Sequence, residues 1–350
     1  MASYTCCRIL KGFGAKPAAV WILISVLFIS WWVFVPRLFR INTPPFLAMI
    51  GYMYLPFIGF SFMLLLIADI MGLAAWYFLK VKFNVKYELL IVFILTIAML
   101  CYGYIDAKNI RTIQIDILTD KLPADIDRIR IVQISDLHIG RNYDVNQLIS
   151  TLKITGMAGP DLIVLTGDTV DMDMRNDEYF YKILGTMKAP LGKFAVTGNH
   201  EHYAGMKQAV EFMERAGYTV LRSDWRDLGP IVIAGIDDPG RVVVSRQNDG
   251  LELLQSIPEN LRNKFILFLR HQPNVPEDII GLFDLKLSGH THAGQVWPFR
   301  YVVSFVYGVK QGLSAFGDSF LYVSNGTGYW GPPIRFLAPP EVTIIDVIRK

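Results

Sequence analysis

The chain has 350 residues, of which 52% are hydrophobic and 19% charged, and its formal net charge is only +3. This balance, without a dense basic cluster, argues against a nucleic-acid partner. All three cysteines, Cys6, Cys7 and Cys101, precede residue 107, so the rest of the chain can form neither disulfides nor thiolate metal sites. Any metal ligands there must be nitrogen and oxygen atoms.

Residues 1–106 differ sharply from the remainder and predict a membrane anchor. Residues 17–35 carry no charge and have the length of about 19 residues that a bilayer crossing requires. Lys16 precedes this run, and Arg37 and Arg40 follow it. A cleavable signal peptide is the competing interpretation, but the run is long and is followed by more apolar sequence. We therefore expect a spanning helix.

Two further apolar runs follow. Residues 44–79 contain a single charge, Asp69, and residues 89–105 contain none. Pro56 and Gly59 could divide the first of these runs into an interfacial piece and a true span. The sequence therefore predicts a transmembrane anchor of three or four helices, in a multi-pass integral membrane protein.

The orientation of this anchor depends on the number of spans. If there are three spans, two groups of basic residues are cytoplasmic: the lysines and arginines before the first span and the lysines near residues 80–86. This arrangement places the following domain outside the cytoplasm. Four spans reverse the placement, and the charge bias favours the extracytoplasmic side only slightly. Asp69 is a costly intramembrane carboxylate; helix packing is favoured over transport because no second intramembrane charge offers a partner.

Residues 107–122 are polar and are expected to form a linker to a domain at 123–350. In that domain, apolar runs alternate with segments of helical period, which predicts an α/β fold with two packed sheets. The expected strands are 129–135, 162–166, 194–197, 231–235, 265–269, 285–288, 320–324 and 342–347. The expected helices are 146–155, 177–187 and 206–216.

Five short polar motifs follow five of these apolar runs. They are Asp136-Leu137-His138, Gly167-Asp168-Thr169-Val170-Asp171, Gly198-Asn199-His200-Glu201, the single His271, and Gly289-His290-Thr291-His292. Each is weak alone and could be an ordinary glycine turn. Together they predict a common site, because open α/β sheets gather ligand-binding groups in the loops that follow their strands.

The residue types in these motifs indicate a two-metal hydrolase centre. Imidazole and carboxylate ligands together favour Mn, Fe or Zn over Ca or Mg, with Mn the leading expectation. Two such ions about 3.5–4 Å apart can share a bridging carboxylate and a bridging hydroxide. That hydroxide is expected to attack phosphorus.

At this point the sequence resembles the calcineurin-like metallophosphoesterases, whose blocks D-x-H, GD-x-x-D, GNH-[ED], H and GH-x-H match residues 136–292 in order. The resemblance implies a four-layer α-β-β-α sandwich. It also implies two divalent metal ions with Asp168 bridging them. The first ion would be held by Asp136, His138, Asp168 and His292, and the second by Asp168, Asn199, His271 and His290.

The same resemblance leaves His200 free to act on substrate. In the family, this histidine neutralises phosphoryl charge or protonates the leaving group, and the aspartate at the position of Asp171 orients it. Asn199 and His200 are accordingly expected to bind substrate, with His200 and Asp171 as the catalytic pair. Both roles suit general acid catalysis.

The substrate class is narrowed by a departure from one branch of the family. Met172 follows Asp171 where the phosphoprotein phosphatases have arginine, which argues against that activity. The apolar N-terminus, residues 287–295 and the ending at 329–335 resemble the membrane-anchored branch, which includes phosphodiesterases and UDP-2,3-diacylglucosamine pyrophosphatases of lipid A biosynthesis. The expected partners are therefore the lipid bilayer and an amphipathic, lipid-linked phosphodiester or pyrophosphate.

Two alternatives stay open. The domain could act on a soluble or cyclic nucleotide, or it could be a non-catalytic sensor or scaffold that regulates the membrane helices. Arg270, Arg300 and Lys310 could form a basic rim for an anionic head group. The apolar stretch 301–307, with Trp297 and Phe299, could meet acyl chains or the bilayer, or could be buried in the core. The sequence carries no indication of oligomeric state.

Overall fold

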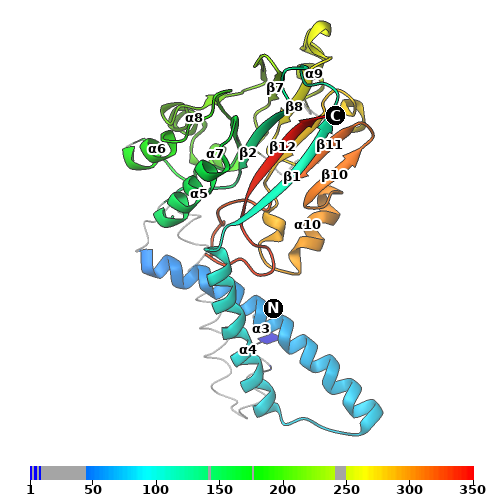
Figure 1. The fold of residues 1–350 in the computed structure, drawn as a ribbon. Coiled ribbons are helices and arrows are strands. Elements are labelled where there is room, and N and C mark those ends of the chain that lie inside the picture. The colour runs from blue at the N-terminus through cyan, green and yellow to red at the C-terminus, as the bar shows by residue number, and fades with distance from the viewer. Residues whose placement is uncertain (2–3, 6–7, 9–44, 141–142, 176, 241–249) are drawn as a thin grey trace. The chain divides into compact units, whose positions relative to one another are not determined.

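The computed structural model describes the chain except residues 2–3, 6–7, 9–44, 141–142, 176 and 241–249. It forms two compact units (Figure 1). The first unit comprises Met1–Ile105 with Trp330–Phe336, and the second comprises Asp106–Tyr329 with Leu337–Lys350. The expected first span at 17–35 and the pair Cys6-Cys7 lie outside the described residues.

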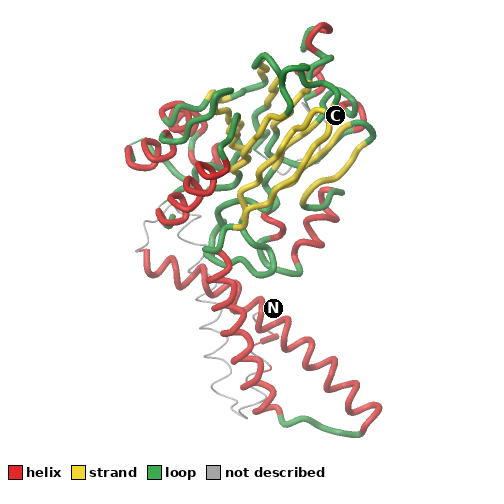
Figure 2. The backbone as a smooth tube through the Cα atoms, in the orientation of Figure 1, coloured by secondary structure: helices red, strands yellow, loops and turns green. Residues whose placement is uncertain are grey.

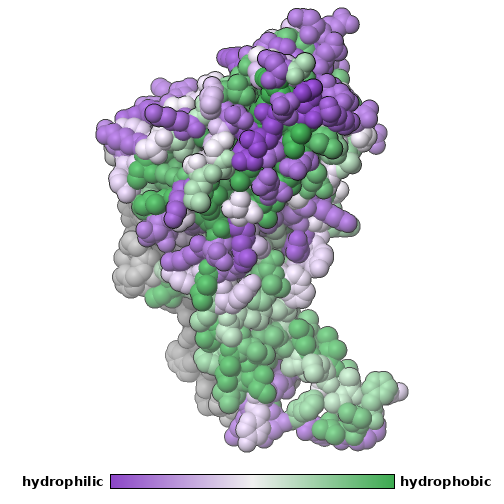
Figure 3. Space-filling model, viewed as in Figure 1, coloured by the Kyte–Doolittle hydropathy of each residue, from purple (hydrophilic) through white to green (hydrophobic). Residues whose placement is uncertain are grey.

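The first unit is built on two apolar helices. Helix α3 spans Pro45–Ala74 and continues into a π-helical turn, η1 (Ala75–Leu79), and α4 spans Val85–Ala107. Met49–Leu79 and Val85–Ala107 are each long and apolar enough to cross a membrane. Figure 3 shows hydrophobic residues gathered over α3 and α4. These helices cover the second and third apolar runs found in the sequence.

Of the two alternatives for this run, the structure shows the unbroken one, because Pro56 lies inside the continuous helix α3. Apolar membrane-type helices tolerate proline where neighbouring groups satisfy the freed backbone carbonyl. Asp69, for which the apolar runs offer no charged partner, is contacted by the Tyr4 hydroxyl and the Arg8 guanidinium. Arg8 also pairs with Glu88 at the start of α4. These contacts join distant parts of the first unit and favour a packing role for Asp69.

The segment Trp330–Phe336 belongs to the first unit although it lies near the end of the chain. The Arg335 amide donates to the Gly103 carbonyl of α4 at 2.9 Å, and the Phe336 ring lies 5.0 Å from Phe60 and 5.5 Å from Tyr102 in edge-to-face contacts. A Cβ on Gly103 would lie 2.7 Å from the Ile334 side chain. The close approach of this segment to α4 therefore requires glycine at 103.

The second unit contains two six-stranded mixed sheets (Figure 2). The first has the order β1-β12-β2-β3-β4-β5, in which only β12 and β2 pair antiparallel. Its strands are β1 (Arg111–Thr119), β2 (Arg128–Ile134), β3 (Leu162–Thr166), β4 (Lys193–Val196), β5 (Thr219–Val220) and β12 (Glu341–Arg349). The second has the order β10-β11-β9-β8-β7-β6, with antiparallel pairs at both edges. Its strands are β6 (Asp224–Asp227), β7 (Ile231–Gly235), β8 (Phe265–Leu269), β9 (Leu285–Ser288), β10 (Gly312–Phe316) and β11 (Ser319–Val323).

Three hydrophobic clusters hold these sheets and their helices together. One packs α5 (Val145–Ala158), α6 (Glu178–Gly185) and α8 (Met206–Arg215) on the outer face of the first sheet. A second lies between the two sheets, and a third packs α9 (Leu251–Ser256) and the 3₁₀ turns η2 (Glu259–Leu261) and η3 (Glu277–Ile279) on the outer face of the second sheet. The central strands are buried on both faces, which explains their nearly continuous apolar sequences.

The prediction of an α/β fold with two packed sheets is confirmed, and each of the eight expected strands is present within two residues of its predicted bounds. The structure differs at the expected linker 107–122, which contains β1. Ile113, Ile115 and Ile117 alternate there with polar residues, and the strand pairs in parallel with β12. This alternation is typical of a half-buried edge strand, and its polar face gave the segment the composition of a linker.

Candidate metal centre

The strands bring the five motifs together at the carboxyl ends of their central members. The first three motifs follow β2, β3 and β4 of the first sheet, and the last two follow β8 and β9 of the second. Helix α7 (Asn199–Ala204) begins within the third motif, and the 3₁₀ turn η4 (His292–Gly294) begins within the fifth. The parallel registers of β2-β3-β4 and of β8-β9 carry these loops to one edge of each sheet.

Five of the predicted ligands adopt a left-handed backbone conformation that is uncommon for residues other than glycine. Their φ angles are between 49° and 70°. These residues are Asp136, His138, Asp168, His290 and His292. Such conformations cost about 1–3 kcal/mol each and persist where the surrounding structure fixes them, most often at functional sites. The loops therefore hold these side chains in one direction at a cost in backbone strain.

A first group of potential ligand atoms comes from Asp136, His138 and His292. The Nε2 atoms of His138 and His292 lie 2.9 Å apart, and His292 Nε2 lies 3.4 Å from Asp136 Oδ1. All three residues are buried. Two neutral imidazole rings can direct the lone pairs of these nitrogens at the same point, and a cation placed there would bind both.

A second group comes from Asp168, His271 and His290. His271 Nδ1 donates to the Thr166 carbonyl at 2.7 Å, so its Nε2 is directed at Asp168 Oδ2, 3.1 Å away, and at His290 Nδ1, also 3.1 Å away. A carbonyl that holds Nδ1–H in this way fixes the imidazole tautomer with Nε2 available for a metal ion. Asp168 Oδ2 also lies 3.9 Å from His138 Nε2, so this carboxylate is close to ligands of both groups.

The Asn199 side chain provides an independent test of whether a metal ion fits. Its Oδ1 atom is buried and has no hydrogen-bond partner among the described residues. A buried carbonyl oxygen without a donor costs about 1–3 kcal/mol, which a cation would offset by accepting its lone pair. Together with the converging imidazole nitrogens and carboxylate oxygens, this atom makes a donor set that fits two borderline divalent cations.

The electrostatics of the cluster agree with that fit. Burial lowers the pKa of His138, but Asp171, Asp168 and Asp136 outweigh it and raise the pKa to about 9. Burial likewise opposes a rise at His271, yet Asp168 and Asp136 hold its pKa well above the usual value. Burial and the neighbouring charge of His271 lower the pKa of His290 to about 3. The buried carboxylates thus attract positive charge into the cluster, as protons on histidine or as bound cations.

Two glycines of the motifs permit the close packing of these loops. A Cβ at Gly198 would lie 2.2 Å from Asp168 Oδ1, and a Cβ at Gly289 would lie 2.2 Å from Asp136 Oδ2. Neither position could carry a side chain without displacing the carboxylate. The glycine in each motif therefore leaves room for a ligand that another motif supplies.

Asp171 joins two histidines. His138 Nδ1 and His200 Nδ1 each lie 2.7 Å from Asp171 Oδ1. The contact with His138 leaves that ring's Nε2 in the first ligand group, whereas His200 keeps its own Nε2 for other contacts. Burial opposes ionisation of Asp171, but the two histidines outweigh it and lower the pKa of the carboxyl. Asp171 is therefore an ionised acceptor that orients both rings.

Glu201 organises the site, although no role was predicted for it. Its fully buried carboxylate accepts the backbone N–H groups of Asp168, Thr169, Val170 and Gly198 at 2.6–3.1 Å. These bonds tie the loop after β3 to the start of α7. The signal was present, because glutamate three residues after a helix-capping glycine is placed to accept exposed N–H groups at a helix start.

Tyr307 is the second residue that the sequence did not assign. It ends helix α10 (Phe299–Tyr307), and its hydroxyl lies 2.6 Å from His290 Nε2. No motif marks it.

Arg270 was expected in a basic rim, but it is buried at 2% exposure. It follows β8, and its amide donates to the Leu287 carbonyl of β9.

Comparisons with known proteins show which family the chain resembles. Residues 129–294 match the family model described as calcineurin-like phosphoesterase. An uncharacterised metallophosphoesterase of Aquifex aeolicus is 34% identical over 71% of this chain and 96% of its own length. A transmembrane protein with metallophosphoesterase domain from Danio rerio is 28% identical over 72% of this chain and 61% of its own length. Among solved structures, a dimetal phosphatase from Danio rerio is 13% identical, with a TM-score of 0.38, over 58% of this chain and 88% of its own.

Proposed function

Because this chain belongs to the calcineurin-like phosphoesterase family, and is therefore a metal-dependent phosphoesterase hydrolase of a dinuclear-metal family, we propose that it cleaves a phosphodiester or pyrophosphate bond in a lipid-linked substrate. The observation that carries this proposal is the presence of the ligand cluster in one chain with two helices of membrane-spanning length. UDP-2,3-diacylglucosamine is the first compound to test. Free or cyclic nucleotides are the alternative substrates.

Two divalent cations would occupy the cluster, and we propose that they are Mn²⁺. Asp136, His138, Asp168 and His292 would hold one, and Asp168, Asn199, His271 and His290 the other. Bound there, they supply Lewis-acid activation of water and neutralise the charge of the phosphoryl group. The closeness of Asp168 to both groups and the unpartnered Asn199 oxygen support this assignment.

His200 is the residue that we propose to act on the leaving group. Its Nδ1–H donates to Asp171, which fixes the orientation of the ring. The His200 side chain is 13% exposed, compared with 1% for His138 and 0% for His271. Of these three rings it is the most accessible to substrate. Asn199 and His200 would together contact the phosphoryl oxygens.

The anchor at 1–106 completes the proposal. It would make the protein a multi-pass membrane protein that lies beside its substrate in the bilayer, with the catalytic domain on the extracytoplasmic side. The apolar character of α3 and α4 and the relatives named as transmembrane proteins support membrane association. The orientation rests on the distribution of lysine and arginine alone.

The test is hydrolysis by the full chain reconstituted in nanodiscs with Mn²⁺. Three substrates are compared: bis(p-nitrophenyl) phosphate, UDP-2,3-diacylglucosamine and cyclic AMP. We expect turnover of the first two, which Asn199→Ala abolishes and the exposed control Asn146→Ala retains. Preference for cyclic AMP over the lipid would replace the proposed substrate class, and full activity in Asn199→Ala would overturn the assigned centre.

A further inference from the structure

Helix α10 exposes an apolar surface in the part of the chain that the structure describes. None of its nine residues is buried. Five of them are large, apolar and more than 45% exposed, and Phe305 reaches 89%. The exposed residues are Phe299, Tyr301, Val302, Phe305 and Val306. A contiguous exposed apolar face on a soluble-type domain is unusual unless it binds something.

The other surface helices of the unit behave differently. Helix α8 buries Ala209, Phe212 and Met213 and turns its charged residues to solvent. Helices α5 and α6 each bury a similar stripe and expose single apolar residues such as Met157 and Tyr179. Isolated exposed residues of that kind are ordinary. Figure 1 shows α10 on the side of β10 and β11, apart from α5, α6 and α8.

The chain segment that contains α10 carries charges of one sign, although the Asp238 carboxylate acts on Tyr307 at the last turn of the helix. Between residues 295 and 313 the chain contains Arg300 and Lys310 and no acidic residue. An aromatic and aliphatic face flanked by basic residues is typical of helices that lie in the interface of an anionic bilayer. A second copy of this surface is a poorer match, because a two-fold contact would bring the same basic residues together.

Helix α10 is also connected to the ligand cluster. Tyr307 on its last turn lies 2.6 Å from His290 Nε2, and His290 Nδ1 lies 3.1 Å from His271. Tyr307 therefore links the side of the helix opposite its exposed face to the cluster. A lipid-linked substrate drawn from the bilayer at α10 would have its polar bond close to the proposed metal ligands.

We propose that α10 is a membrane-docking helix that inserts Phe305 and its neighbours into the acyl boundary of an anionic bilayer and so presents the head group of a lipid-linked substrate to the site. The proposal rests on the proposed function for its substrate, but the docking itself is independent of hydrolysis. Transfer of two of these side chains from water to hydrocarbon is enough for a measurable effect on binding.

The first experiment measures docking directly. The full chain with Cys6, Cys7 and Cys101 changed to serine carries Phe305→Cys, labelled with an environment-sensitive fluorophore, in nanodiscs of phosphatidylcholine and phosphatidylglycerol. Brominated acyl chains should quench this label and leave the matched label at Met157→Cys on α5 unaffected. An unquenched Phe305→Cys label overturns the proposal, and energy transfer between two labelled chains would assign the face to a second copy instead.

The second experiment separates docking from catalysis. Val302→Ser with Phe305→Ser should raise KM for UDP-2,3-diacylglucosamine in nanodiscs about tenfold, since 1.4 kcal/mol of lost binding corresponds to that factor. Turnover of soluble bis(p-nitrophenyl) phosphate should equal that of the parent and of the control Met157→Ser. Equal lipid KM values in variant and parent contradict the presentation of substrate by α10. No lipid turnover in the parent, with soluble turnover intact, contradicts the proposed substrate while the quenching result still decides the docking.

Discussion

The ligand cluster and helix α10 belong to the same unit but treat their side chains in opposite ways. Asp136, Asp168 and His271 are charged or ionisable and at most 2% exposed, whereas Phe305 is large, apolar and 89% exposed. Burying charge and exposing apolar surface both cost folding free energy. The unit keeps a buried charged cluster and an exposed apolar helix despite these costs. We therefore infer that both features serve a function. Four substitutions, from the largest expected effect to the smallest, test how this unit uses buried charge and exposed apolar surface.

Asp168→Asn is the substitution that most directly tests the cluster. Loss of the carboxylate that approaches both ligand groups should reduce turnover of bis(p-nitrophenyl) phosphate by about 10³-fold or more, the scale of removing preorganised electrostatic stabilisation. Bound metal, measured by mass spectrometry of the purified protein, should fall with it. The control Asp173→Asn changes an exposed carboxylate nearby and should retain both activity and metal. Full metal content with full activity in Asp168→Asn would remove the cluster from the mechanism.

His200→Gln tests whether the cluster contains a proton donor in addition to metal ligands. A general acid contributes about 10²–10⁴-fold, and less for a leaving group that is already a weak base. We therefore expect about a 10²-fold loss of kcat on a methyl phosphodiester and a much smaller loss on the p-nitrophenyl ester, with unchanged metal content. Equal losses on the two esters would make His200 a binding residue only.

The sequence predicted the ligand residues better than it predicted Glu201 and Tyr307, which contact the ligand loops. The ligands lie in short motifs next to apolar strands, so composition and order marked them, and the structure brings the motifs to one edge. Glu201 and Tyr307 act through the backbone of another loop or through the ring of another residue. The spacing of Glu201 from Gly198 is a local signal, whereas the contact of Tyr307 depends on which loops meet and no local pattern encodes it. Strand β1 was missed because its polar residues resemble those of a linker, although the alternation of Ile113, Ile115 and Ile117 is a local signal for a strand.

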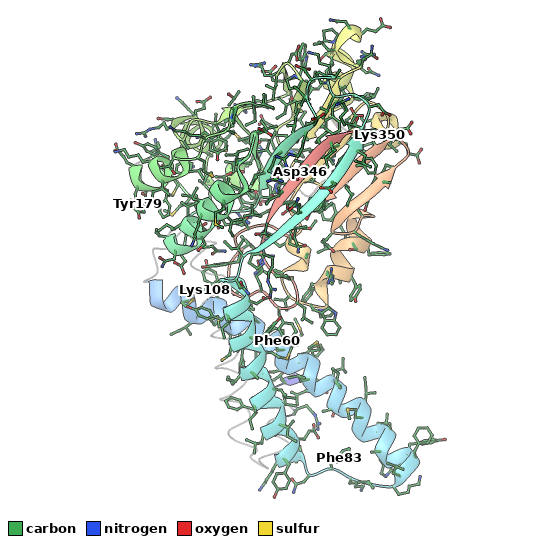
Figure 4. The ribbon with its side chains drawn as sticks, viewed as in Figure 1. Phe60, Phe83, Lys108, Tyr179, Asp346 and Lys350 are labelled. Carbon is green, nitrogen blue, oxygen red and sulfur yellow. The ribbon has the colours of Figure 1, made fainter. Side chains whose placement is uncertain are left out.

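The buried carboxylate of Asp346 differs from those of the cluster because its partner is an arginine side chain, Arg130. It lies on β12 (Figure 4) and accepts Arg130 Nε at 2.8 Å and Nη2 at 2.7 Å. These hydrogen bonds from Arg130 hold the pKa of Asp346 below its usual value of 3.8. A carboxyl whose pKa is lowered in the folded state stabilises the protein above that value, and the stabilisation is lost as the pH falls through the folded pKa.

We therefore expect Asp346→Asn to lower the free energy of unfolding by about 2 kcal/mol at pH 7, the scale of hydrogen bonds to charged groups. The difference from the parent should shrink as the pH falls below about 4, where the carboxyl of the unfolded parent binds a proton, and should disappear as the pH falls through the lower pKa of the folded parent. Urea unfolding followed by tryptophan fluorescence measures both. Turnover should be unaffected at 25 °C, since this pair lies in the strands rather than in the loops of the site. A pH-independent difference would mean that packing rather than charge accounts for the loss.

The smallest effect is expected at the contact between α10 and the ligand cluster. Tyr307→Phe keeps the packing of α10 and removes only the hydroxyl that contacts His290 Nε2. Partners that orient a metal-ligating histidine typically contribute about tenfold to metal affinity, so the Mn²⁺ concentration for half-maximal activity should rise by about that factor. The control Tyr179→Phe removes an exposed hydroxyl from α6, outside the docking face, and should change nothing. The loss in Tyr307→Phe should be equal for soluble and lipid substrates, because it acts through the metal ligand, whereas loss of the exposed apolar face affects the lipid alone. A Tyr307→Phe variant impaired only on the lipid would place this tyrosine in substrate contact and make α10 a single binding surface up to its last turn.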